Sequence, residues 1–280
     1  MLQPDGLAKK QAEDFINMMF NNLIIESIDP GITLIKVSRP SALNALNTET
    51  LKELKFALTQ EAENPATRVI VLTGAGEKAF IAGADITEMK DKSVSEGVDF
   101  AQLGHSVAKL LELMPKPTLA AVNGFALGGG TELALSCDFI LASDRAIFGQ
   151  PEVSLGVIPG FGGTIRLSKF IGLPRAKELI FTGRRVNAAE ALQIGLVNQV
   201  IPAQNFMERV LEVAKSISMQ SLSAVSSAKR LLNEFSETHG LNYKLDAETQ
   251  AFARLFGSFD QREGMTAFTE KRMPKFQGMI

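Results

Sequence analysis

The sequence has few of the residues that build disulfides and metal centres. Its 280 residues include one cysteine, two histidines and no tryptophan. Because Cys137 is alone, no intramolecular disulfide can form, which is typical of a reducing compartment. His105 and His239 stand far apart and in no ligand spacing, so a zinc or iron site would need carboxylates only. We therefore expect no metal, and a Ser-His-Asp triad is equally poorly supplied.

Long apolar runs and runs of one charge are also missing. The apolar stretches, such as Thr118–Val122, have the length of a strand and fall far short of a membrane span. The net charge is -2, and no basic run offers a footprint for nucleic acid. The stretch 1–20 carries acids and no arginine, which is neither a signal peptide nor a good transit peptide. We expect no membrane or nucleic-acid partner, and a cytoplasmic location, or the mitochondrial matrix if the source is a eukaryote.

The hydrophobic pattern predicts an α/β core followed by a helical region. Alternating segments at Leu23–Ile28 and Ile32–Val37 flank a turn and predict a hairpin. Further strands are predicted at Val69–Thr73, Thr118–Val122, Phe139–Ser143 and Ile147–Phe148, with a long loop over 74–85. Helices are predicted at 47–63, 97–113 and 131–137, after 160–163 and after Asn187, and for nearly all of the chain from Ala203. The predicted division is an N-terminal extension (1–20, helical from Leu7), a core (21–202) and a helical C-terminal region (203–280).

Two glycine-containing loops lead directly into predicted helices. One contains Ala84 and ends at Asp85, with Glu88 three residues later as in a capping box. The other is Gly128-Gly129-Gly130. Such loops present unpaired N–H groups at the positive end of a helix, and two of them aimed at one oxygen form an oxyanion hole. Tight turns and phosphate loops are the alternatives, although neither a GxGxxG fingerprint after the first strand nor a GxxxxGK[ST] motif is present.

Two glutamates lie close to these loops in the sequence. Glu132 falls three residues after Gly129, in the first turn of the predicted helix, and Glu152 follows Pro151 ahead of an apolar loop. Taken singly, the first is also explained as an acid that stabilises a helix N-terminus, and the second as a solvated loop acid. An acid held among apolar residues would instead have a raised pKa and donate a proton.

As an ordered set, these motifs resemble the crotonase, or enoyl-CoA hydratase/isomerase, family over nearly the whole chain from Leu23 to about Phe276. Any one of the matching segments is weak, but their order is highly specific. They are Arg39-Pro40, Asn44-Ala45-Leu46, residues 79–86, 121–124 and 128–133, Cys137-Asp138, Gln150-Pro151-Glu152, Gly156, residues 158–164 and 263–268, and Lys271-Arg272.

The resemblance implies a fold, an assembly and a set of site residues. The fold would be an α/β spiral of repeated ββα units, with a helical C-terminal region that packs into a trimer or a dimer of trimers. The N–H groups of Ala84 and Gly129 would bind the thioester oxygen, and Glu132 and Glu152 would be catalytic. The acyl-CoA substrate would contact Ala82, Gly83, Asp85, Ile86, Thr87 and Gly160, together with Phe268 and Lys271 of the tail.

The presence of both glutamates favours hydration among the reactions of this family. Glu132 would activate water for attack on C3 of a trans-2-enoyl-CoA, and Glu152 would protonate C2, giving a 3-hydroxyacyl-CoA in fatty-acid or related acyl-CoA catabolism. No cofactor is expected, since coenzyme A is part of the substrate. The alternatives are an enoyl-CoA delta-isomerase, which can work with one acid at the position of Glu152, and a non-catalytic scaffold of the same fold, such as one that binds RNA.

Overall fold

The computed structural model describes residues 20–234, 249, 252 and 258–277. The helix predicted from Leu7, and the extension as far as residue 19, lie outside the described residues. The predicted division at residue 202 stays a prediction. No helix in the described part of the chain is long and apolar enough to cross a membrane. The same part holds no group of three or more side chains placed to bind a metal ion.

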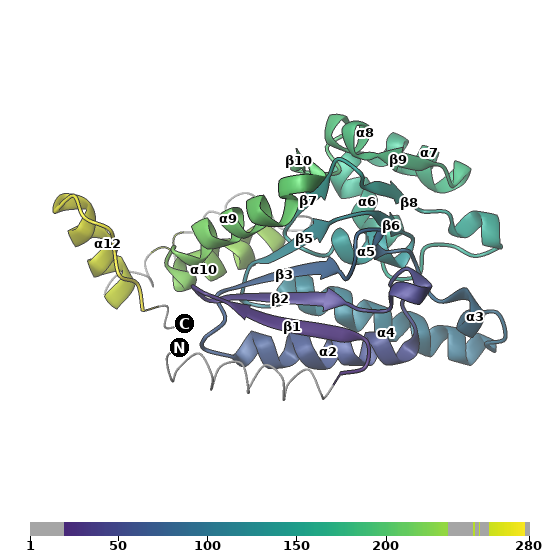
Figure 1. The fold of residues 1–280 in the computed structure, drawn as a ribbon, viewed down its shortest axis with the longest axis horizontal. Coiled ribbons are helices and arrows are strands. Elements are labelled where there is room, and N and C mark those ends of the chain that lie inside the picture. Colours follow the sequence, from purple (N-terminus) through teal and green to yellow (C-terminus); the bar gives the residue numbers. More distant parts are fainter. Residues whose placement is uncertain (1–19, 235–248, 250–251, 253–257, 278–280) are drawn as a thin grey trace.

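A mixed sheet of six strands forms the centre of the molecule (Figure 1). The strand order is β1-β2-β3-β5-β7-β10. The bounds are β1 Leu23–Ile28, β2 Ile32–Val37, β3 Val69–Gly74, β5 Thr118–Val122, β7 Phe139–Ser143 and β10 Gln199–Ile201. The antiparallel pairing of β1 with β2 confirms the predicted hairpin, and all other neighbours in this sheet are parallel.

A second sheet of four short strands has the order β4-β6-β8-β9. Its members are β4 Ala79–Ile81, β6 Phe125–Leu127, β8 Ile147–Gly149 and β9 Arg185–Asn187. The prediction that 74–85 is all loop is therefore wrong at β4, and β6 and β9 went unpredicted. Three residues are too few to display an alternating pattern, so pairing with neighbours rather than local sequence defines these strands.

Strands of the two sheets follow each other along the chain and then give way to helices. The order β3-β4-α3-α4, β5-β6-α5 and β7-β8-η2-α6 repeats the same unit, as the predicted ββα fold requires. The helices are α2 Thr48–Glu63, α3 Ile86–Met89, α4 Val94–Leu113, α5 Gly129–Ala134, α6 Gly163–Ile171, α7 Leu173–Thr182, α8 Ala188–Gln193, α9 Phe206–Ser218, α10 Leu222–Glu234 and α12 Phe259–Thr269, with 3-10 turns η1 Pro40–Ala42, η2 Glu152–Leu155 and η3 Ala203–Asn205.

Several helices begin or end away from their predicted bounds. Helix α4 begins at Val94 because Ser93 caps it, with Glu96 completing a capping box. Helix α5 begins at Gly129 rather than at residue 131 and ends at Ala134. The caps predicted at Asn187 and Asp85 are confirmed. The box predicted for Asp85 and Glu88 is wrong, because the carboxylate of Glu88 accepts from the N–H of Thr48 at 3.0 Å.

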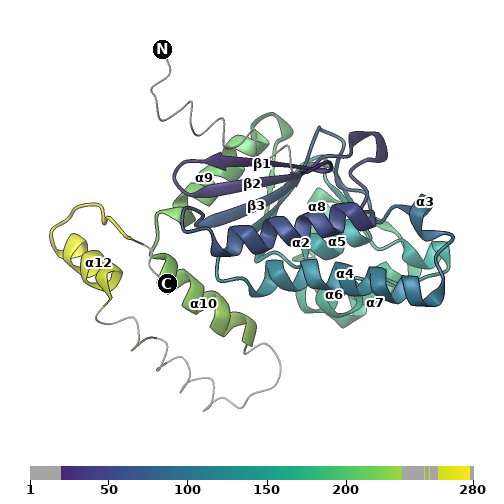
Figure 2. The same cartoon turned by 90° about the horizontal axis from the view of Figure 1, so that it is seen from below.

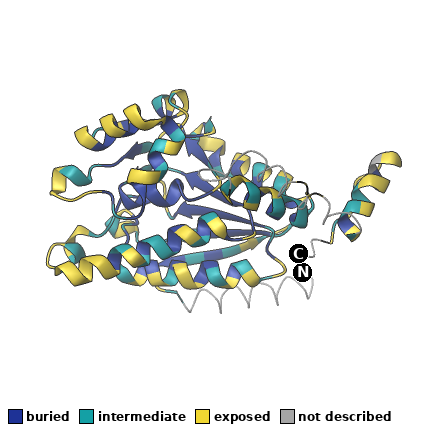
Figure 3. Cartoon of the chain, turned by 180° about the vertical axis from the view of Figure 1, so that it is seen from behind, coloured by how far each residue is buried: buried dark blue, intermediate teal, exposed yellow. Residues whose placement is uncertain are grey.

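Helices cover both faces of the main sheet. Helices α2 and α4 lie on one face and α9 on the other (Figure 2). Successive side chains along each strand point to opposite faces of the sheet and so contribute to two hydrophobic cores. Ile35 and Leu72 join the core beneath α2 and α4, whereas Leu34 and Val71 pack under α9. Figure 3 shows the central strands buried and the outer helical faces exposed. The rigid sheet thus fixes where each strand ends and the next loop begins.

Candidate functional site

A cavity of about 390 Å³ opens between the second sheet, α4 and the segment around η2. Its walls come from three separate stretches of the sequence, within 82–101, 127–132 and 151–161, so only the tertiary fold assembles it. It brings together both predicted acids, both predicted oxyanion-hole residues and half of the predicted substrate-binding residues. They are Ala82, Gly83, Ala84, Ile86, Gly129, Glu132, Glu152 and Gly160.

The two predicted oxyanion-hole residues both line this cavity. Ala84 pairs with Leu46 in a parallel bridge in which the N–H of Leu46 donates to the carbonyl of Gly83 and the N–H of Asp85 donates to the carbonyl of Leu46. This pattern uses the groups on either side of Ala84 and leaves its own N–H unused. Gly129 is the first residue of α5, where helix N–H groups have no partner in the preceding turn. In the described part of the chain, neither N–H donates to a protein acceptor.

Glu132 projects from the first turns of α5 and is 1% exposed. Its Oε1 accepts from the N–H of Phe161 at 2.8 Å and from the N–H of Gly163 at 2.7 Å. Burial raises the pKa of Glu132, while these N–H donors and the nearby Arg166 act to lower it. The carboxylate is therefore fixed in one orientation by the loop before α6.

Glu152 begins η2 and is half-buried on the opposite wall. Burial, together with the negative charge of Glu132, raises its pKa to about 7. Gln150, which is 1% exposed, lies beside it. With the Gln150 amide nitrogen turned toward this acid, it lies 2.9 Å from Oε1 and 3.1 Å from Oε2. A neutral acid with one aligned neighbour is suited to giving up a proton.

The environments of the two acids differ in a way that separates their protonation states. Glu132 has two backbone donors and a cation nearby, whereas Glu152 has the carboxylate of Glu132 as its charged neighbour. Two acids that interact in this way titrate as a pair. We expect the first ionisation at Glu132 and the remaining proton on Glu152, which matches a base and an acid on opposite sides of one cavity.

Apolar side chains enclose the part of the cavity next to the acids. The rings of Phe100 and Phe161 pack with centroids 5.4 Å apart, and the Phe161 ring also rests against Gly104 of α4. Met89 and Leu155 add to this lining. The ammonium of Lys92 lies 5.2 Å from the centre of the Phe100 ring and pairs with Glu88 at 2.7 Å. This end of the cavity therefore fits a short apolar group.

Three of the predicted binding residues, Asp85, Thr87 and Lys271, are not among those that line the cavity. Asp85 pairs with Arg39 at 2.9 Å and accepts from the N–H of Thr87, and these contacts hold the loop. Lys271, after α12, is exposed, and the side chain of Phe268 lies outside the described residues. Their proposed contacts with coenzyme A stay predictions.

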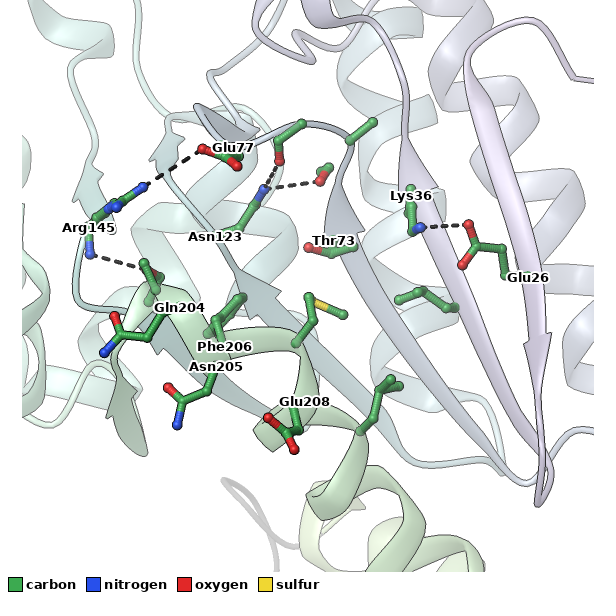
Figure 4. Close-up of a pocket in the computed structure, with 18 of the residues that line it drawn as sticks. Glu26, Lys36, Thr73, Glu77, Asn123, Arg145, Gln204, Asn205, Phe206 and Glu208 are labelled. Atoms are coloured by element: carbon green, nitrogen blue, oxygen red, sulfur yellow. Dashed lines mark hydrogen bonds and ion pairs between the residues drawn. The ribbon is translucent and has the colours of Figure 1, made fainter.

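A larger cavity, of about 680 Å³, lies where β3, β5 and β7 end and α9 begins (Figure 4). Its cations are already paired, Lys36 with Glu26 at 2.6 Å and Arg145 with Glu77 at 3.8 Å. Asn123 donates to two carbonyls of the loop after β3 at 2.7 and 3.0 Å. Since Glu26 and Glu77 there are paired with cations, whereas Glu132 and Glu152 meet in the smaller cavity, the smaller cavity is the better candidate for catalysis.

The sequence did not reveal the groups that hold Glu132. The N–H groups of Phe161 and Gly163 belong to the backbone, so no side-chain pattern marks them. The Gly160–Gly163 stretch before a helix was the one available signal, because helix N-termini bind carboxylates. The roles of Gln150 and Phe100 in lining or supporting the site depend on contacts between distant segments and had no local signal.

Comparison with known proteins finds relatives over most of the chain. Residues 27–279 match the family model described as Enoyl-CoA hydratase/isomerase. The chain is 47% identical over 255 residues to the short-chain-enoyl-CoA hydratase of Clostridium acetobutylicum, covering 91% of this chain and 97% of that protein. It is 45% identical over 259 residues to the crotonyl-CoA hydratase of Syntrophomonas wolfei, covering 92% and 99%. The crystal structure of the enoyl-CoA hydratase from Bacillus anthracis matches with a TM-score of 0.89 at 40% identity, covering 92% of this chain and 100% of that one.

Proposed function

The chain belongs to the enoyl-CoA hydratase/isomerase family, and we propose that it is a hydro-lyase that adds water across the 2,3 double bond of a short-chain trans-2-enoyl-CoA. The observation that carries the proposal is the meeting of two acids, Glu132 and Glu152, with the unused N–H groups of Ala84 and Gly129 in one cavity. The product is a 3-hydroxyacyl-CoA.

The first part of the mechanism is polarisation of the thioester. The N–H groups of Ala84 and Gly129 bind the carbonyl oxygen and stabilise the negative charge that develops there. A donor of this kind is worth about 3 kcal/mol of barrier. The polarised carbonyl withdraws electrons from the conjugated double bond and makes C3 electrophilic. The groups that do this belong to the chain and the substrate.

The second part is addition of water. Glu132, ionised and held by Phe161 and Gly163, takes a proton from a water molecule whose oxygen forms the new bond to C3. The electron pair of the double bond moves to give an enolate on the thioester oxygen. Glu152, protonated, then donates to C2 as the enolate collapses, so one proton is taken from water and one is delivered to carbon.

The presence of two acids in one cavity favours hydration over double-bond isomerisation. An isomerase transfers one proton and can work with one acid, whereas both acids here face the same cavity. Steady-state rates on crotonyl-CoA and on a 3-enoyl-CoA separate the two activities. We expect kcat/KM to be greater for hydration of crotonyl-CoA, and a chain that acts only on the 3-enoyl isomer would refute the proposal.

A short acyl chain is favoured by the size of the cavity and its apolar lining. The packed rings of Phe100 and Phe161 form part of the wall of a cavity of about 390 Å³. A chain-length series of trans-2-enoyl-CoA substrates tests this directly. We expect kcat/KM to be highest for the four- to six-carbon members and to fall for ten carbons or more; the reverse order would contradict it.

Self-association through the C-terminal helices is a further part of the proposal. Helix α12 stands apart from the α/β core in Figures 1 and 2. Exposed apolar side chains, Leu232 on α10 and Met265 on α12, support a contact with another copy. Sedimentation equilibrium should give a trimer or a dimer of trimers, and a monomer at micromolar concentration would contradict this.

A further inference from the structure

Behind the candidate site, one arginine connects three elements. Arg166 of α6 donates from Nη2 to Oε2 of Glu112 on α4 at 2.7 Å. From Nη1 it donates to the carbonyl of Phe161 at 3.0 Å. Its side chain is 11% exposed, so these bonds are shielded from water. The guanidinium thus joins the middle of α4 to the loop that precedes α6.

The same loop carries the two N–H groups that hold Glu132. The carbonyl of Phe161 accepts from Arg166 while the N–H of Phe161 donates to Glu132. The glycine between the two donors, Gly162, has φ +106°, and a Cβ there would lie 2.2 Å from Nη1 of Arg166. The absence of a side chain at this position therefore leaves room for the guanidinium beside the loop.

We infer that Arg166 is a positioning residue for hydration: by fixing the Phe161–Gly163 loop to Glu112, it keeps both N–H donors aimed at Oε1 of Glu132. Arg166 touches neither the cavity nor the reacting atoms. Its planar fork suits the task because it bonds a carboxylate and a carbonyl at once, which an ammonium at that distance does less well. This inference rests on the proposed function of Glu132 as the base.

The charges around Glu132 define what a pH profile will report. Arg166 of α6 lowers its pKa, and its own charge acts in turn on Glu152 of η2. Strands β4, β5 and β6, which pack against α5, carry no titratable side chain. Helix α4 places His105, Lys109 and Glu112 around Arg166 rather than against the acid. Ionisation of Glu132 should therefore set the acid limb of the kcat/KM profile.

The test compares Arg166→Gln and Arg166→Lys with the parent enzyme on crotonyl-CoA. Misplacement of a base by about 1 Å costs roughly 100-fold, so we expect kcat to fall about 10- to 100-fold in Arg166→Gln, with KM within threefold. The acid limb should move about one unit to higher pH, because loss of the cation and of aligned donors raises the pKa of Glu132. Arg166→Lys keeps the charge but not the fork, and should lose about tenfold in kcat.

Matched controls separate positioning from general effects of charge. Lys109→Gln removes a neighbouring cation that makes no contact with the loop, and His105→Gln removes the other group that titrates beside Arg166. Both should keep the parent kcat and acid limb. The inference would be overturned if Arg166→Gln kept kcat within twofold of the parent and the acid limb stayed at the parent pH. A loss of kcat with the acid limb at the parent pH would also overturn it.

Hydrogen exchange keeps a failure of the inference distinct from a failure of the proposed function. The amides of Phe161 and Gly163 should exchange at least tenfold faster in Arg166→Gln than in the parent, whether or not the parent hydrates crotonyl-CoA. If Arg166→Gln does not fold, Arg166→Lys gives the same comparison. Unchanged exchange in the folded variant would overturn the positioning role, and an inactive parent would overturn the proposed function alone.

Discussion

The carboxylate of Glu152 packs directly on the backbone of Gly128, where α5 begins. A Cβ at residue 128 would lie 2.8 Å from Oε1 of Glu152. Gly128 also has φ +49°, a backbone conformation that side chains disfavour. The turn that presents the N–H of Gly129 and the acid proposed to protonate C2 are therefore fitted to each other at one position.

Replacing Gly128 by alanine should disturb both groups together. We expect Gly128→Ala to lower kcat for crotonyl-CoA hydration about 100-fold, since displacement by about 1 Å costs that much. The matched control is Gly76→Ala, because Gly76 has φ +77° and nothing within 4 Å of its Cβ position. Backbone strain alone predicts equal losses in the two variants, and this result would contradict the proposed contact with Glu152.

The pKa of Glu152 predicts the alkaline limb of the rate profile. Burial raises this pKa to about 7, and the mechanism needs the protonated form. We therefore expect kcat/KM to fall as pH rises through about 7, because Glu152 then loses the proton that it donates. Glu152→Gln should remove this limb and lower kcat about 100- to 10,000-fold. Glu208→Gln, at the larger cavity, should keep the limb; persistence of the limb in Glu152→Gln would assign it to another group.

The ring of Phe100 should limit the length of the acyl chain. Phe100→Leu shortens a side chain in the wall of the cavity and gives room for added methylenes. Each methylene accommodated in an apolar pocket is worth about 1–3 kcal/mol, so the ratio of kcat/KM for the ten-carbon over the four-carbon substrate should rise at least tenfold. Phe56→Leu, on the exposed surface of α2, should leave it unchanged. An unchanged ratio in Phe100→Leu would place the limit elsewhere.

A buried ion pair should hold α10 on the core. The ammonium of Lys229 pairs with Asp138 at 3.0 Å and donates to the carbonyls of Leu111 and Lys116. Lys229→Met leaves the carboxylate without its cation, and we expect a loss of about 3–5 kcal/mol in the free energy of unfolding. Adding Asp138→Asn should recover part of that loss. Denaturant unfolding measures both, and no recovery would show that packing rather than charge is responsible.

The sequence predicted the long elements well because their patterns are local. The hairpin over 23–37 and the helix ending at Glu63 show clear periodicity and turn or cap residues, and both are confirmed. The second sheet was largely unpredicted, because β4, β6 and β9 have three residues each and gain their hydrogen bonds from distant strands. The predicted capping box was wrong because Glu88 had two possible partners. Its carboxylate accepts from the N–H of Thr48, forty residues away, instead of from the start of its own helix.

The site was predicted only in part, because some of its residues belong to local sequence motifs and others meet only in the folded chain. Ala84, Gly129, Glu132 and Glu152 were found as members of an ordered set, and the fold brings them to one cavity. What holds Glu132 in place was not predictable. The N–H groups of Phe161 and Gly163 lie about thirty positions further along the chain and leave no mark on side-chain chemistry.

The rate at which Glu132→Gln hydrates crotonyl-CoA tests the central claim most directly. Glutamine keeps the size of the side chain but cannot accept the proton of the attacking water, so we predict a fall in kcat of about 100- to 10,000-fold. Exchange of the C2 protons of butyryl-CoA with solvent deuterium, measured on the same sample, should persist in Glu132→Gln and be lost in Glu152→Gln. Hydration by folded Glu132→Gln at the parent rate would contradict the account.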